Sequence, residues 1–183
     1  MSGSIVAAAV ALIFVTSFIS GVFGMAGGFI LLGALLLVLP VTTTMVVHGI
    51  VQFASNFSRM VILRRHIDWR IISTTTLGTA AAVGLLVISR YLPDKRTIFV
   101  VLGLVPMLVW IPQRWLRLDA SRPVHGFCAG FASGAFNVGA GVAGPLVDIF
   151  FVRTEMDRRT IVGTKSTIQS IAHVCKSVYY GSL

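Results

Sequence analysis

Polar side chains recur at helical spacing in two otherwise apolar stretches of the chain. In each stretch four polar residues follow one another at intervals of four, four and three, which places them on one face of an α-helix. Polar and ionisable groups in a membrane helix normally face the bundle interior or an aqueous path. We therefore predict two helices whose polar faces line one route. The first stripe consists of His48, Gln52, Asn56 and Arg59, and the second of Lys165, Gln169, His173 and Lys176.

The apolar runs between charged loops predict a series of helices. An unbroken helix over 5–39 would be roughly 50 Å long, which exceeds a hydrocarbon core of about 30 Å. The glycines of SGVFGMAGG, residues 20–28, therefore predict a break in it. The further helices are expected over 42–63, 71–89, 97–112 and 158–180, with a second broken helix over 123–152.

Two motifs occur twice in the same order, which indicates an internal duplication. SGVFGMAGG at 20–28 is matched by SGAFNVGAG at 133–141, and the first polar stripe is matched by the second. We interpret residues 1–112 as a first repeat, 113–122 as a basic loop between repeats, and 123–183 as a second repeat. The second repeat is expected to be incomplete, because two helices follow the stripe only in the first.

Small residues at four-residue spacing predict close approach between helices. Gly78 and Ala82 form one such pair, and Gly126, Gly130 and Gly134 form a longer ridge. Side chains this small allow helix backbones to approach closely inside a membrane. We expect both sets to lie at helix–helix contacts.

Composition places the chain in a membrane. Hydrophobic residues make up 56% of it and charged residues only 11%, and the mean hydropathy is +0.90. Soluble domains average about 25% charged residues. The predicted class is an all-α, polytopic helical membrane protein with two repeated halves and glycine-broken helices, multi-pass in the inner cell membrane.

The net charge of +9 reflects basic loops, so a nucleic-acid partner is not expected. Loops 64–70 and 114–122 are assigned to the cytoplasm and loop 90–96 to the outside. If each broken segment crosses the membrane once, the two repeats run parallel. If both halves of each broken segment cross, the repeats are inverted, and we favour the parallel arrangement.

No metal-type spacing and no nucleophile–base pair can be recognised in the sequence. Cys128 and Cys175 lie inside apolar segments, where cysteines usually pack as small hydrophobic residues. We therefore expect neither an enzyme nor a protein that depends on a metal or cofactor.

The charges of the stripes favour a negatively charged substrate. Arg59, Lys165 and Lys176 are cationic, and no carboxylate stands in either stripe. An uncompensated cationic lining attracts anions. Broken helices add free backbone N–H groups, which also favour negative charge. The candidates for such groups are Gly27, Gly28 and the segment Asn137 to Gly141, which includes Gly139.

Several of these residues have a second interpretation. Arg59 and Lys176 lie toward helix ends and could extend to lipid headgroups. Lys165 is placed deeper, so we rank it first among the binding residues. His48 is either a neutral hydrogen-bonding residue or a proton carrier. Asp148, outside the stripes, is expected to pair with a base such as Arg153.

Four motifs in a fixed order are FISGVFGMAGGFILLG, RRHIDWR, GFCAGFASGAFNVGAG and VGTK. Together they make the chain resemble the sulfite exporter TauE/SafE family of bacterial membrane permeases over nearly its whole length. That resemblance implies about eight membrane helices in two related halves, so the chain is expected to lack the last pair. It also implies export of sulfite, sulfoacetate and related organosulfur anions.

We therefore expect a secondary transporter that exports small anions such as sulfite or organosulfonates, with protons as a candidate coupling ion. A passive anion channel would use the same lining. The missing helices suggest a non-transporting or truncated subunit, or a chain that assembles as a homo-oligomer. The stripes could also serve only to hold helices together by hydrogen bonds. Saturable flux that responds to a proton gradient would distinguish the carrier from the channel.

Overall fold

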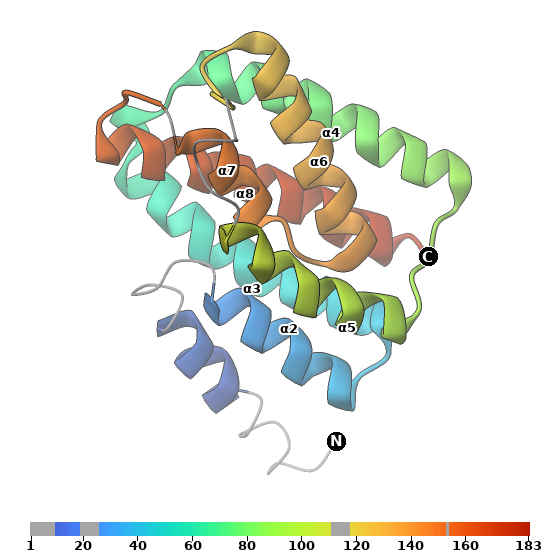
Figure 1. Cartoon of the computed structure of the whole chain (residues 1–183). Coiled ribbons are helices and arrows are strands. Elements are labelled where there is room, and N and C mark those ends of the chain that lie inside the picture. The colour runs from blue at the N-terminus through green and yellow to red at the C-terminus, as the bar shows by residue number, and fades with distance from the viewer. Residues whose placement is uncertain (1–9, 19–25, 111–117, 153) are drawn as a thin grey trace.

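The computed structural model describes residues 10–18, 26–110, 118–152 and 154–183 (Figure 1). Every regular element in these ranges is a helix, which confirms the all-α class. Residues 10–18 form the first helix described. The later α-helices are α2 (Ala26–Val38), α3 (Val41–Ile62), α4 (Trp69–Ser89), α5 (Lys95–Leu104), α6 (Pro123–Ala140), α7 (Gly144–Phe151) and α8 (Arg158–Gly181), and the 3-10 helices are η1 (Arg64–His66) and η2 (Val105–Trp110).

Local sequence signals set several helix ends. Asp68, Asp94 and Asp157 precede α4, α5 and α8, and each side chain accepts a hydrogen bond from a backbone N–H in the first turn. Pro123 begins α6, where its missing N–H costs nothing. Gly141 ends α6 with a φ of +83°, a left-handed conformation that suits glycine.

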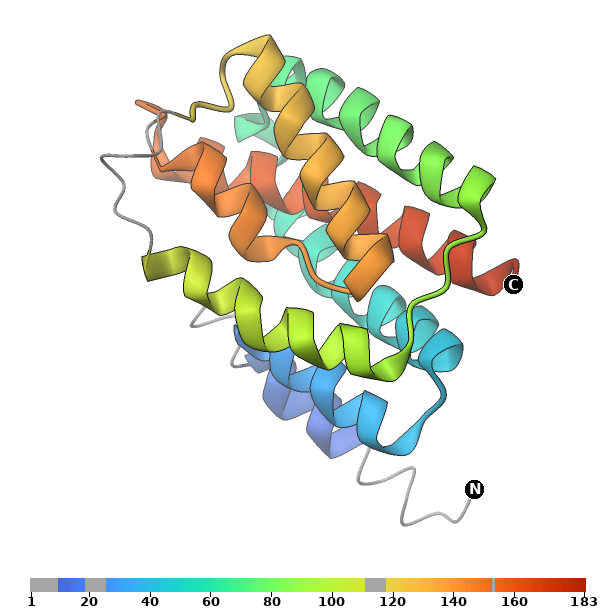
Figure 2. The ribbon, with the colours of Figure 1, turned by 45° about the vertical axis from the view of Figure 1, so that its right-hand side comes forward.

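Helices α4 and α6 pack side by side in the same direction through their small residues (Figure 2). A Cβ atom on Gly78 would meet the Phe127 carbonyl, and one on Gly130 would meet the Thr75 carbonyl. The Thr79 hydroxyl donates to the Gly130 carbonyl at 3.1 Å. The predicted close approach at these glycines is therefore confirmed.

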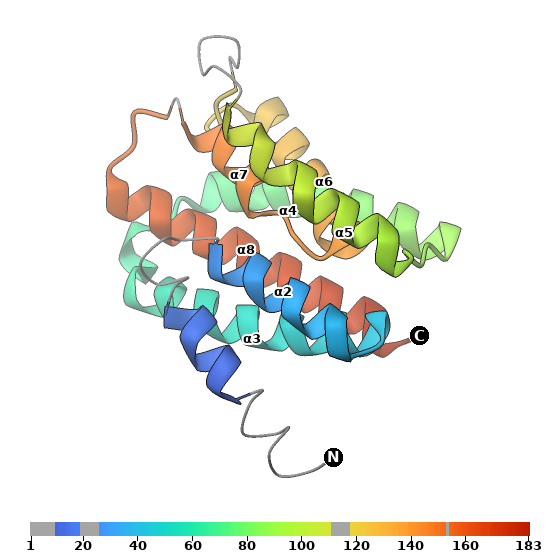
Figure 3. The same ribbon diagram turned by 60° about the horizontal axis from the view of Figure 1, so that its bottom comes forward.

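Helices α3 and α8, which carry the two polar stripes, also lie side by side, but they run antiparallel (Figure 3). Gly49, near the beginning of α3, faces His173 and Ser177 in the second half of α8. At the other end, Gly163 of α8 faces Leu63 just after α3. The preference for parallel repeats was wrong, because the two matching helices run in opposite directions.

The reversal comes from the second helix break. After α6 the chain turns at residues 141–143, and α7 runs back beside α6, so that the Ala120 N–H donates to the Phe150 carbonyl at 2.8 Å. The broken segment therefore returns toward its beginning instead of crossing once. The break also comes later than predicted, since residues 133–140 remain helical. Of the first motif, residues 20–25 lie outside the described residues, and 26–28 already belong to α2.

Helices from the two predicted repeats pack on one another. Helix α3 packs on α8 and α4 packs on α6, so each main helix pair joins a helix from before residue 113 to one from after residue 122. The duplication itself stays a prediction. The fold shows that the two predicted repeats are not separate bodies in space.

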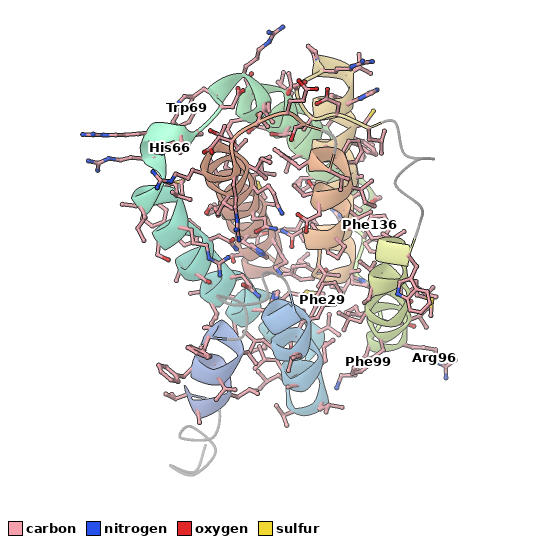
Figure 4. The ribbon with its side chains drawn as sticks, turned by 60° about the vertical axis from the view of Figure 1, so that its left-hand side comes forward. Phe29, His66, Trp69, Arg96, Phe99 and Phe136 are labelled. Carbon is pink, nitrogen blue, oxygen red and sulfur yellow. The ribbon has the colours of Figure 1, made fainter. Side chains whose placement is uncertain are left out.

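Charged residues mark the two ends of the bundle. The α3–α4 junction, with His66 and Trp69, lies at one end, and Arg96 at the beginning of α5 lies at the other (Figure 4). The beginning of α8 lies at the same end as the α3–α4 junction, because the Asp68 N–H donates to the Thr164 hydroxyl at 3.0 Å. Helix α6 also begins there, beside α4. We call this the basic end; its described arginines are Arg64, Arg65, Arg70, Arg122, Arg158 and Arg159.

One described helix, Trp69–Ser89, is both long enough and apolar enough to cross a membrane by itself, and Gly27–Val38 is a shorter apolar helix. The stripe helices α3 and α8 contain 22 and 24 residues. At 1.5 Å per residue they are about 33 and 36 Å long, similar to a hydrocarbon core of about 30 Å. Large apolar side chains with wide exposure cover the outside, among them Phe14, Leu37, Ile62, Leu77 and Ile88.

Two apolar clusters hold the helices around the stripes. The cluster away from the basic end joins α2, α3, α5, α6 and α8, and that at the basic end joins α4, α6, α7 and α8. The first contains Leu32, Leu36, Met45, Ile98, Val138, Val142, Tyr179 and Tyr180, and the second contains Ile71, Ile72, Ala120, Ala129, Val147, Phe150, Phe151 and Ile168. The polar side chains of α3 and α8 are thus fixed by apolar packing at both ends.

Candidate functional site

The two polar stripes meet at His48 of α3 and Lys176 of α8. Lys176 Nζ lies 2.7 Å from His48 Nδ1 and donates to the Gly141 carbonyl at 3.1 Å. His48 Nε2 lies 3.0 Å from the Gly28 carbonyl. A carbonyl only accepts, so we assign the proton to Nε2, and Nδ1 accepts from the lysine. One chain of hydrogen bonds therefore joins the beginning of α2 to the end of α6.

Lys176 is completely buried, and its charge has no acidic partner among the described residues. The chain has six acidic residues, and all of them belong to the described part. Their positions are accounted for elsewhere: Asp68, Asp94 and Asp157 cap helices, Asp119 contacts Ser121 and Arg122, Asp148 pairs with Lys165, and Glu155 is exposed. The interpretation that Lys176 extends to headgroups was therefore wrong.

Lys165 differs from Lys176 because it forms an ion pair with Asp148 of α7. The sequence treated Lys165 as unpaired and expected Asp148 to pair with Arg153, which lies outside the described residues. The pairing was missed because the turn after α6 lays α7 against α8, and sequence spacing does not show this. Lys165 is partly exposed, with 24% of its side chain accessible, whereas Lys176 is completely buried.

Other stripe residues surround the His48–Lys176 contact. The Gln52 amide lies 3.5 Å from His48 Nε2 and against Gly28, where a Cβ atom would overlap it. The ring of His173 packs edge-on against that of His48, with ring centroids 5.8 Å apart. Asn56 donates to the Gln52 carbonyl at 2.9 Å. Gln52, Asn56 and His173 are buried, so the structure brings these stripe residues together inside the protein.

Arg59 and Gln169 lie further along the same seam, toward the basic end. Both are partly buried, as is Lys165. Arg59 interacts with other parts of the protein. These three residues extend the polar seam beyond the buried cluster.

The two predicted sources of free backbone groups differ. Gly27 and Gly28 lie in the first turn of α2, where N–H groups have no intrahelical acceptor, as the sequence predicted. The segment Asn137 to Gly141 ends a helix and therefore offers carbonyls, not N–H groups. The prediction of N–H groups there was wrong, and the Gly141 carbonyl binds Lys176 instead.

Gly139 and Asn137, both in that segment, have different neighbours. Gly139 is nearest to Tyr91, at 3.7 Å from a constructed Cβ atom, and not to the stripes. Asn137 is 1% exposed, and neither its amide nitrogen nor its amide oxygen has a hydrogen-bond partner in the described structure. Such unsatisfied buried amide atoms are rare in proteins and call for an explanation.

A narrow recess beside Gln52 adds two residues that the sequence analysis missed. It is too narrow to admit a water molecule. Its lining consists of Thr16, Ser17, Gly27, Leu31, Val51 and Gln52. The signal in the sequence was present, because Thr16 and Ser17 are the only polar residues between positions 5 and 18.

The cationic positions lie at different depths. At about 1.5 Å per residue, Lys165 is about 10 Å from the beginning of α8 at the basic end. Lys176 lies about 16 Å further along the same face of α8, close to the opposite end of the bundle. His48 is correspondingly about 10 Å from the beginning of α3. The seam therefore carries a paired lysine near one end and an unpaired lysine near the other.

Comparison with known proteins identifies a family for the chain. The family profile described as sulfite exporter TauE/SafE matches residues 9–183. Searches of curated proteins and of solved structures give no significant match. The match spans nearly the entire sequence, and the matched family consists of helical, membrane-integral transporters. The chain therefore belongs to the sulfite exporter TauE/SafE family of helical membrane permeases.

Proposed function

We propose that the chain exports small oxyanions, such as sulfite or organosulfonates, along the seam between α3 and α8. The observation that carries this proposal is the buried ammonium of Lys176, which contacts His48 and the Gly141 carbonyl and has no carboxylate beside it among the described residues. Burying an unpaired charge is costly unless a group of opposite charge is bound. An anion would supply that group.

The neighbouring groups suit an oxyanion. Lys176 and the Gln52 amide both provide N–H donors, and His48 and His173 can do so in a suitable tautomer. Hydrogen bonds from charged donors to oxyanions are the strong ones in proteins. The first-turn N–H groups of α2, which have no acceptor within the helix, add further positive potential close to Gly28. The unpartnered Asn137 amide on α6 is a further candidate donor.

The Lys165–Asp148 ion pair suggests how an anion enters. It lies nearer the basic end and is partly accessible, with 24% and 32% of the two side chains exposed. An incoming anion would compete with Asp148 for Lys165 and then move along Gln169 and His173 to Lys176. The paired lysine attracts the anion weakly and releases it easily, whereas the unpaired lysine binds it.

We place the protein in the inner cell membrane as a multi-pass protein with its basic end in the cytoplasm. The support for this orientation is the set of arginines that the α3–α4 junction, the beginning of α6 and the beginning of α8 contribute to one end. Cytoplasmic loops carry an excess of Lys and Arg. The Lys165–Asp148 pair would then face the cytoplasm, the side from which an exporter takes its substrate.

A carrier fits the geometry better than an open channel. Direct contacts from Lys176 to His48 and Gly141 close the seam, and the recess at Gln52 is too narrow for water. An anion could pass only if α8 moved away from α3 or from the turn after α6. Such a step predicts saturable flux, whereas a channel would give ohmic conduction.

The experiment is anion flux in vesicles that contain the purified chain alone. Sulfite and a small sulfonate such as sulfoacetate should both give saturable flux. Lys176→Gln removes the charge and keeps hydrogen-bonding capacity, and it should lower the flux at least about tenfold at equal protein level. Lys95→Gln changes an exposed lysine at the beginning of α5 and should transport like the wild type. No flux of any tested anion by the wild type, or full flux by Lys176→Gln, would refute the proposal.

A further inference from the structure

His48 is held in one protonation pattern by its two neighbours. Its Nε2 donates to the Gly28 carbonyl at 3.0 Å, and its Nδ1 accepts from Lys176 at 2.7 Å. Lysine offers only donors, and a carbonyl offers only an acceptor. The neutral imidazole therefore satisfies both neighbours, and Nδ1 is the atom that would receive another proton.

The groups around His48 oppose that second proton. Helix α8 contributes the Lys176 ammonium and the His173 ring, α2 contributes the Gly28 carbonyl, and α3 itself contributes Gln52. All the carboxylates of the chain are accounted for elsewhere in the described structure. A proton on Nδ1 would place a second cation against Lys176 and remove the acceptor for its N–H.

An anion reverses this balance. Placed between the two side chains, an oxyanion accepts one hydrogen bond from Lys176 and another from a protonated Nδ1. Its negative charge then offsets the repulsion between the two cations. The anion and the proton consequently stabilise each other at this position, which is a coupling free energy between two ligands.

We propose, building on the proposed function, that His48 takes up one proton when an anion binds at Lys176, so that the anion and the proton are carried together. The step forms one N–H bond at His48 Nδ1 with a proton from the aqueous phase. The Lys176–His48 hydrogen bond breaks at the same time, which removes a direct side-chain link between α8 and α3. An O–H bond of a hydronium ion breaks to supply that proton, and no other covalent bond changes. Anion binding and the opening of the seam are thereby linked.

Calorimetry of the purified chain tests this directly. Methanesulfonate is a suitable probe because it stays ionised at every working pH, so any proton taken up enters the protein. Titrations in two buffers with different ionisation enthalpies give the number of protons bound per anion. The wild type should take up close to one proton near neutral pH. His48→Gln can still donate to Gly28 and accept from Lys176, and it should bind methanesulfonate with no proton uptake.

The control is His66→Gln, which changes a histidine in η1 at the basic end and should match the wild type in proton number. Anion binding by the wild type without proton uptake would refute the coupling and leave the proposed function standing. Proton uptake that persists in His48→Gln would place the proton on another group and overturn the assignment. Wild type that binds and transports no sulfonate or sulfite would refute both proposals.

Discussion

His48 Nδ1 and Lys176 Nζ lie 2.7 Å apart, although the two residues are 128 positions apart in the sequence. Through this contact, helix α3 is joined to α8, and the Gly28 carbonyl is linked to the Gly141 carbonyl. These two glycines end the two related motifs of the sequence. The contact is the point where the last residues of both motifs and both polar stripes converge.

Removing the buried charge should affect transport and stability in opposite directions. Lys176→Met replaces a completely buried ammonium by an apolar side chain of similar length. Replacing buried ionic groups by apolar residues is often neutral or stabilising by about 1–4 kcal/mol. We expect flux to be lost while the melting temperature in detergent stays at or above that of the wild type. A fall of many degrees would mean that Lys176 serves mainly to hold the fold together.

The Lys165–Asp148 pair should show coupling between its members. Lys165→Gln leaves Asp148 without its partner, and Asp148→Asn leaves Lys165 without its own. Each single change should destabilise the protein, and the double variant should recover most of that loss, giving a coupling energy of about 1–3 kcal/mol for a partly exposed pair. Thermal unfolding of the four proteins measures the coupling. Additive effects would show that the pair contributes nothing.

Flux measurements should distinguish the role of Lys165 from that of Lys176. The charge of Lys165 is balanced by Asp148, so Lys165→Gln should retain measurable flux and change mainly the substrate concentration at half-maximal rate. Lys176→Gln should lose flux at every concentration. The comparison needs equal protein level in the vesicles. If Lys165→Gln were as inactive as Lys176→Gln, the binding position would have to be moved toward the basic end.

The sequence predicted the features that depend on local spacing. The helical class, the pairing of the two stripe helices and the close approach at Gly78 and Gly130 all follow from residue periodicity. The sequence did not predict that Asp148 meets Lys165, because a three-residue turn after α6 decides it. The sequence also did not rank Lys176 first, because its position close to a helix end suggested a contact with lipid headgroups. In the structure the turn after α6 covers that end of α8 and buries the side chain.

Glycine positions on α4 offer a matched pair of substitutions. A Cβ atom on Gly78 would overlap the backbone carbonyl of Phe127, which cannot move without shifting α6. Gly78→Ala should therefore destabilise the protein by at least about 1–3 kcal/mol, the usual cost of overpacking. Gly84 has no atom within 4 Å of a constructed Cβ, so Gly84→Ala should be neutral or stabilise by up to about 1 kcal/mol. Equal melting temperatures for the two variants would contradict the packing between α4 and α6.

The turn at Gly141 should be similarly sensitive. Its φ of +83° costs other residues about 1–2 kcal/mol. An added Cβ would also lie 2.6 Å from Leu32 Cδ2 and 2.9 Å from Met45 Sδ. Gly141→Ala should lower both stability and flux, because it displaces the carbonyl that binds Lys176. Gly139→Ala, whose nearest neighbour is Tyr91 at 3.7 Å, is the control and should leave flux unchanged. Normal flux in Gly141→Ala would separate this carbonyl from the function.

The interleaving of α3 with α8 and of α4 with α6 bears on how the protein can move. A carrier whose two sequence halves are separate bodies can rock one half against the other. Here such a motion would pull apart two helix pairs at once, one of them in backbone contact through Gly130 and Thr75. Backbone contact makes α4 and α6 the stationary body, and the seam between α3 and α8 is the part that yields. Each of the two helix pairs is thus formed by one helix from each predicted repeat.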